Sequence, residues 1–156
     1  MYNMTIYTIL VNSISKLAGS TTTNAMYNCD WSILPENTKF KVGFAFVSDT
    51  VNITSYSSIA LISVNLGGVN TYRTTSLSTF TPISSLVGVL TPLALSTTTN
   101  LTADASTNNR IWLQSRPKNN AFQVVITAHT GAFWVDNASA IPTNYVLILS
   151  FETVDE

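Results

Sequence analysis

Charged side chains are scarce in this sequence. They make up 10% of its 156 residues, whereas about 25% is usual for a globular domain. Lys and Arg total 7, Asp and Glu total 8, and the formal net charge is −1. The basic residues are scattered, so no basic stripe exists that would neutralise a phosphate backbone. We therefore expect no nucleic-acid partner.

Cysteine and histidine are scarcer still. The single cysteine, Cys29, has no partner for a disulfide within the chain. This disfavours a secreted, disulfide-built domain and fits synthesis in a reducing compartment. With the single histidine, His129, it supplies too few nitrogen and sulfur ligands for a structural zinc site. We expect no metal and no cofactor, although a calcium site near Asp136 and Asn137 stays open without a loop motif to support it.

Catalytic signatures are also lacking. The sequence contains no G-x-S-x-G nucleophile elbow, no phosphate-binding loop and no dinucleotide fingerprint. His129 precedes Thr130-Gly131, a turn at which an exposed polar residue is ordinary. A Cys29–His129 pair is disfavoured because Cys29 belongs to an alternating, inward-facing pattern. We predict that the protein is not an enzyme; a small hydrolase that uses His129 is a third-ranked alternative with no indicated substrate.

Long apolar runs are absent as well. The longest apolar-leaning stretch, residues 83–95, contains Pro92 and several Ser and Thr residues and is too short to span a bilayer. The N-terminal residues MYNMTIYTILV lack the basic start and the long apolar centre of a signal peptide. We expect neither a membrane span nor a signal peptide.

What the sequence does contain is material for β-strands. Hydrophobic residues make up 46% of the chain, and β-branched and aromatic residues alternate with polar ones. The clearest pattern places Phe40, Val42, Phe44 and Phe46 on one face of a strand. Further strands are expected within residues 4–14, 25–33, 58–66, 69–80, 86–95, 101–103, 110–115, 122–126, 133–135 and 145–153.

The spacing of these segments predicts the fold class. Turn signals separate them at short intervals, and no window of helical length has a 3.6-residue period. We predict an all-β protein, a single jelly-roll β-sandwich of about eight to ten antiparallel strands. No repeat or linker divides the chain, so residues 1–156 are expected to form one domain.

The scarcity of charge also bears on function. No charged side chain occurs between Arg73 and Asp104. A surface of Ser, Thr, Asn and apolar groups costs little to desolvate and carries few charges that would keep copies apart, which favours contacts with partners. The alternative is a Thr-rich β protein that simply has low charge.

Aromatic residues are the candidate contact residues. Trp31, Trp112 and Trp134 each lie in a strand-like segment, where packing in the core, contact with a partner and stacking on a ligand are the three alternatives. We select Trp112, Trp134 and Tyr7 as candidates for interface or ligand contact. Residues 1–8 and 153–156 are candidate docking arms.

Several segments, in this order, carry a resemblance. Residues 27–35 read YNCDWSILP; the alternating residues 40–46 follow, then 60–67, then Arg116-Pro117 and 119–124, and finally 145–152. The pattern covers nearly the whole chain and resembles the small single jelly-roll capsid proteins, minor or penton-type, of large icosahedral double-stranded DNA viruses.

The resemblance implies a structural virion subunit. Such a protein self-assembles as a homo-oligomer, a trimer or pentamer, and contacts other capsid proteins. It is made in the host cytoplasm and located in the virion. The alternative function is a carbohydrate-binding or receptor-binding β-sandwich module with a glycan ligand. That alternative requires Trp112 or Trp134 to lie exposed beside Asn or Asp.

Overall fold

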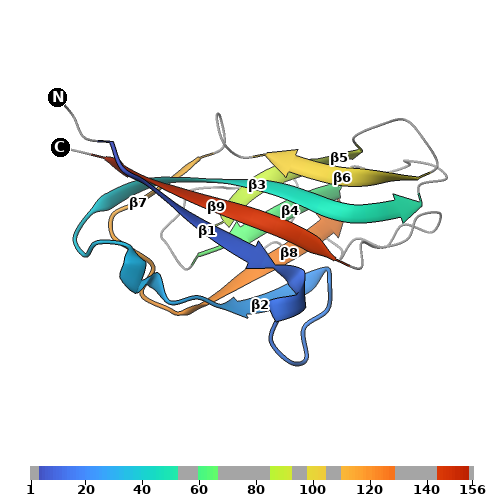
Figure 1. Ribbon diagram of the computed structural model, residues 1–156, viewed down its shortest axis with the longest axis horizontal. Helices are drawn as coiled ribbons and strands as arrows, with labels where there is room; N and C mark the ends of the chain where they lie inside the picture. Colours follow the sequence, from blue (N-terminus) through green and yellow to red (C-terminus); the bar gives the residue numbers. More distant parts are fainter. Residues whose placement is uncertain are drawn as a thin grey trace, which may run out of the picture.

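The computed structural model describes residues 4–52, 60–66, 85–92, 98–104, 110–128 and 144–154. These ranges form nine strands and two short 3-10 helices (Figure 1). The strands are β1 (Ile6–Asn12), β2 (Asn24–Asn28), β3 (Lys39–Asn52), β4 (Ala60–Asn65), β5 (Ser85–Pro92), β6 (Thr98–Asp104), β7 (Ile111–Leu113), β8 (Ala121–Ala128) and β9 (Tyr145–Val154). The helices are η1 (Ser13–Ser15) and η2 (Trp31–Ile33). The strands expected within 69–80 and 133–135 lie outside the described residues.

The strands form two sheets that face each other. The first sheet has the order β1-β9-β3-β6, with β7 beside the start of β3, and the second has the order β5-β4-β8-β2. A short pairing of β5 with β6 joins them, Thr91 opposite Thr102. In Figure 1 the first sheet lies in front with β1 at its lower edge, and the start of β1 and the end of β9 lie at the same end of the molecule.

The pairing pattern identifies the sandwich as a jelly roll. Strand β1 pairs with β9, β2 with β8, β3 with β6 and β4 with β5, all antiparallel. The partners are therefore nested like the two arms of one long hairpin that has been rolled into two sheets. The predicted all-β jelly-roll sandwich is confirmed, with nine strands in the part of the chain that the structure describes.

The core lies between the sheets and follows the alternation of the sequence. All four predicted inward residues of β3 are buried, as are Tyr145, Leu147, Leu149 and Phe151 of β9. The Trp31 ring lies 5.6 Å from the ring of Phe122 in the second sheet and 5.7 Å from that of Phe151 in the first. Aromatic burial across both sheets thus fixes their relative position.

Two features show how closely the sheets approach. A Cβ added to Gly88 of β5 would lie 2.9 Å from the Phe44 ring of the opposite sheet, so glycine is required there for space. The hydroxyls of Tyr27 in β2 and Tyr145 in β9 share a buried hydrogen bond of 2.6 Å. This bond supplies each phenol with a partner inside an otherwise apolar core.

The segment after β2 departs from the sequence-based expectation. A strand was expected through residue 33, but β2 ends at Asn28 and Trp31 begins η2. The Asp30 carboxylate accepts hydrogen bonds from the backbone N–H and the hydroxyl of Ser32, both at 2.9 Å, and so caps this turn. Trp31 stays buried because its indole N–H donates to the carbonyl of Asn119 at 2.8 Å.

The outer edge of β2 is covered by the chain itself. The N–H of Met26 donates to the Ser20 hydroxyl at 3.0 Å, and the N–H of Leu17 donates to the Met26 carbonyl at 2.8 Å. Asn24 and Thr21 exchange two more bonds of 3.1 Å, from Thr21 N–H to the Asn24 carbonyl and from Asn24 N–H to the Thr21 hydroxyl. Residues 17–21 therefore lie beside β2 like part of a further strand and occupy backbone groups of this edge.

Candidate assembly surface

The outer face of the first sheet carries a cluster of apolar side chains. Strand register places Leu10 of β1 opposite Ile148 of β9, and Ile148 opposite Ala45 of β3. In the next row Val146 lies opposite Val47. Opposed side chains in neighbouring strands are about 5 Å apart, so these residues form one surface. We call Leu10, Ala45, Val47, Val146 and Ile148 the outer-face patch.

The outer-face patch is open to solvent. Leu10 is 66% exposed, Val47 42% and Ile148 38%. Polar side chains border it: Thr8 and Ser150 lie in the row on one side, Asn12 and Thr102 end the row of Val146 and Val47, and Asp104 ends the row of Ala45. A contiguous apolar surface with a polar rim is typical of a site that binds another protein.

The sequence of β9 carries a signal for this patch. Residues 145–149 read YVLIL, so apolar side chains occupy both faces of β9. The core covers one face, through Tyr145, Leu147 and Leu149. A strand that is apolar on both sides predicts a second covering layer, and here no described residue provides it for Ile148.

The other end of the same face is charged. The guanidinium of Arg110 forms an ion pair with Glu152, and the ammonium of Lys41 lies 6.0 Å from the centre of the Trp112 ring. Trp112, a predicted contact residue, is 54% exposed at the centre of β7. Its ring is therefore at the surface, with a cation–π contact that restrains its orientation.

The other predicted aromatic contacts differ from Trp112. Tyr7 is half-buried on the inward face of β1, where its ring lies edge-on at 6.5 Å from Phe40. Trp134 lies outside the described residues. Trp31 is a core residue, which leaves Trp112 as the exposed tryptophan in the described part of the chain.

The candidate docking arms are partly sheet. Ile6, Tyr7 and Thr8 lie within β1, and Thr153 lies within β9 opposite Phe40. The N–H of Thr153 also donates to the carbonyl of Thr5 at 2.9 Å. These residues are thus fixed in the first sheet; residues 1–3 and 155–156 are outside the described ranges.

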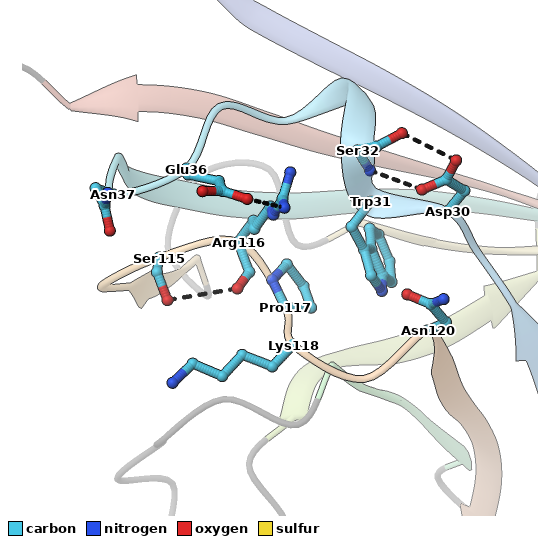
Figure 2. Close-up of a pocket in the computed structure, with 10 residues that line it drawn as sticks. All are labelled: Asp30, Trp31, Ser32, Glu36, Asn37, Ser115, Arg116, Pro117, Lys118 and Asn120. Carbon is cyan, nitrogen blue, oxygen red and sulfur yellow. Dashed lines mark hydrogen bonds and ion pairs between the residues drawn. The ribbon is translucent and has the colours of Figure 1, made fainter.

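A polar cleft of about 360 Å³ lies at one end of the sandwich, between the η2 loop and the loop that follows β7 (Figure 2). Its lining residues are Asp30, Trp31, Ser32, Glu36, Asn37, Ser115, Arg116, Pro117, Lys118 and Asn120. Arg116 forms an ion pair with Glu36 and donates to the carbonyl of Leu34 at 3.2 Å. The Arg116 guanidinium therefore connects the two loops to each other.

The chemistry available in this cleft is limited. The N–H and hydroxyl of Ser32 hold the pKa of the Asp30 carboxyl below its usual value, so this group stays ionised at neutral pH and is a poor proton donor. The Trp31 ring is buried and offers no face on which a sugar could stack. No histidine or cysteine lines the cleft.

Cys29 lies next to the cleft in sequence. It is half-buried, and burial together with the negative charge of Asp30 raises the pKa of its thiol. The thiolate, which is the nucleophilic form, is therefore disfavoured at neutral pH. His129, its hypothetical partner, lies outside the described residues.

Neither metal ligation nor a membrane helix is found in the described ranges. No three His, Cys, Asp or Glu side chains gather there closely enough to hold an ion. Among the described residues, no helix has the length and apolar character needed to cross a membrane. No protein-family model matches the sequence, and no curated protein matches it.

Proposed function

We propose that this protein is a structural subunit of a virus capsid and acts through protein–protein contacts rather than catalysis. The observation that carries the proposal is the outer-face patch, an exposed apolar surface on a rigid jelly-roll sandwich. Its partners are further copies of this chain, as a trimer or pentamer, and other capsid proteins. Nucleic acid is not a partner. The place of action is the virion, after synthesis in the host cytoplasm.

Two properties favour assembly through this surface: it costs little free energy to desolvate, and symmetry repeats each contact. Burial of apolar surface stabilises an interface by roughly 25 cal/mol per Å². Thr8, Ser150 and Thr102 contribute hydroxyl groups to the rim, which cost less to desolvate than charges, and Asp104 is a carboxylate at its end. With charged residues at 10% of the chain, little repulsion separates the copies. Symmetric repetition then multiplies contacts that are individually weak.

The test is the mass of the purified protein across a concentration series, measured by light scattering after size exclusion, with negative-stain imaging of large species. We expect a discrete oligomer whose population grows with concentration, or closed particles. A single copy that persists to the highest concentration would overturn the proposal.

The exposure of Trp112 favours one alternative, a carbohydrate-binding or receptor-binding module. An exposed indole can stack on a sugar ring, although one of its faces already lies near Lys41. A glycan array is the first test, followed by titration of tryptophan fluorescence in the natural protein and in a Trp112→Phe variant. Binding that disappears in the variant supports this alternative; silence across a broad panel rejects it.

A further inference from the structure

Strand β1 is an open edge of the first sheet. The bond from Thr153 N–H to the Thr5 carbonyl shows that the backbone groups of Thr5 point toward β9. Because these directions alternate along an antiparallel strand, the N–H and C=O groups of Ile6, Thr8 and Leu10 point away from β9. No described residue bonds to them.

The sequence around β1 lacks the residues that usually protect an edge strand. Natural edge strands carry Lys, Pro or a bulge that prevents pairing with another chain. Residues 1–15 contain no charged residue, no proline and no glycine. Ile6 is 52% exposed and Leu10 is 66% exposed, so the side chains of this edge are accessible as well. Within the described ranges, no segment has to move away from this edge before a further strand can pair with it.

We propose that β1 pairs with β1 of a second copy of this chain, antiparallel and around a two-fold axis. The two first sheets then become one continuous sheet. This inference rests on the proposed structural function and adds a two-fold contact, which joins a copy in one trimer or pentamer to a copy in the next. A second copy is the occupant because the sequence of β1 matches itself in the antiparallel direction.

The match selects one register. With the axis at Thr8, Ile6 of one copy lies opposite Leu10 of the other, so an apolar pair forms on each side of the axis. Moving the axis by one residue, to Tyr7 or to Ile9, places Ile6 opposite a polar side chain instead. Apolar cross-strand pairs stabilise a sheet, and a two-fold contact doubles each of them.

The geometry of the pair also orients the outer-face patches. The two-fold axis of an antiparallel strand pair is perpendicular to the sheet, so both outer faces lie on the same side of the joined sheet. The dimer therefore presents two outer-face patches on one surface. Further contacts of the assembly can use that surface while β1 holds the pair together.

Cross-linking tests the register directly, in a Cys29→Ala background. Two Thr8→Cys chains face each other with Cα atoms about 5.5 Å apart, a separation that a disulfide can bridge. Two Ile6→Cys chains are the control, because their substituted residues are offset by roughly 14 Å along the strands. We expect rapid dimers of Thr8→Cys, slow dimers of Ile6→Cys, and rapid mixed dimers of Ile6→Cys with Leu10→Cys. Equal rates for all combinations would overturn the register and the pairing.

A second pair of variants tests the backbone contact. Thr8→Pro removes an N–H that points away from β9, whereas Thr8→Val keeps it. By sedimentation equilibrium we expect Thr8→Pro to weaken the dimer at least about tenfold and Thr8→Val to change it less than about threefold. Circular dichroism confirms that each variant is folded.

The outcomes separate this inference from the function on which it rests. If the natural protein assembles but neither Thr8→Cys cross-linking nor the proline effect is seen, the β1 contact is wrong and the structural function stands. If the natural protein remains a single copy at every concentration, both fail. Assembly with both effects supports both.

Discussion

The two end strands of the sandwich, β1 and β2, differ in whether the backbone groups of their outer edges are hydrogen-bonded. The edge of β2 bonds to residues 17–21 through Met26 and Asn24. The edge of β1 bonds to nothing that the structure describes at Ile6, Thr8 and Leu10. The loop that follows η1 thus turns to cover the second sheet and leaves the first one open.

Exposure of the outward-facing apolar side chains varies in both sheets. In the second sheet Val125 of β8 is 9% exposed and Val89 of β5 is 50% exposed, and in the first sheet Ile148 of β9 is 38% exposed. The jelly-roll topology alone gives both sheets equivalent edges. The difference between the two edges is encoded in a few local residues, Ser20 and Thr21 above all.

The largest predicted effect comes from proline at the two edges. Met26→Pro removes the bond to Ser20 and leaves that hydroxyl without its donor, so we expect the free energy of unfolding to fall by about 2 kcal/mol or more. Thr8→Pro removes no bond within the chain, and we expect a loss below about 1 kcal/mol. Urea unfolding at low protein concentration measures both. Equal losses would show that the β1 edge is occupied.

The next effect concerns the phenol pair that ties β2 to β9. Burial raises the pKa of both Tyr27 and Tyr145 above the usual value of 10. A raised pKa means that the fold favours the neutral phenols, so their contribution is complete below pH 10 and is lost above it. We expect the free energy of unfolding to fall with rising pH by up to about 1.4 kcal/mol per unit for each tyrosine.

A Tyr145→Phe variant sharpens this test. It leaves the Tyr27 hydroxyl without its partner and should cost about 1 kcal/mol at pH 8, while the alkaline loss becomes shallower because one titrating phenol is gone. Urea unfolding between pH 8 and pH 11 provides both values. If the free energy of unfolding of the variant falls as steeply with pH as that of the natural protein, Tyr145 does not contribute to the alkaline loss.

A charge on the outer-face patch should weaken assembly rather than folding. Leu10→Lys places an ammonium where we expect apolar contact, and the association constant should fall at least about tenfold. Its matched control is Ile33→Lys, at an isoleucine on η2 that is 52% exposed and lies away from the patch. Both variants should unfold within about 0.5 kcal/mol of the natural protein. Sedimentation velocity distinguishes them, and equal association of the two variants would argue against the patch.

The smallest predicted effect concerns the hydrogen bond between Ser20 and the outer edge of β2. Ser20→Ala removes the acceptor for Met26 N–H and should cost about 1 kcal/mol in urea unfolding. Thr8→Ala, on the open edge, is the control and should change stability by less than about 0.5 kcal/mol. A Ser20→Ala protein as stable as its control would mean that residues 17–21 do not hold the β2 edge.

The sequence alone predicts the inward face correctly in strands where apolar residues alternate with the period of burial. Phe40 to Phe46 in β3, Phe122 to Ile126 in β8 and Tyr145 to Phe151 in β9 were all assigned the correct inward face. The pattern failed where a local side-chain bond replaced the strand. Tyr27, Cys29 and Trp31 continue the alternation, yet the Asp30 cap turns the chain into η2.

The candidate surface was harder to predict than the fold. Trp112 is at the surface, as a contact residue must be, but Tyr7 shares the inward face of β1 with Val11. Which residues gather into the outer-face patch depends on the order β1-β9-β3, which places Ile148 between Leu10 and Ala45, residues about 100 positions or more before it in the chain. Alternation within a single strand carries no information on that order.

The pairing of the first strand with the last has a consequence for synthesis. Thr5 bonds to a residue 148 positions later in the chain. At ordinary rates of translation, synthesis of β1 is complete roughly 7 to 28 seconds before that of β9. During that interval each growing chain carries an uncharged strand that lacks its own partner, and neighbouring ribosomes on one message hold such strands close together. The order in which strands are made therefore makes the proposed β1–β1 contact available before β9 exists.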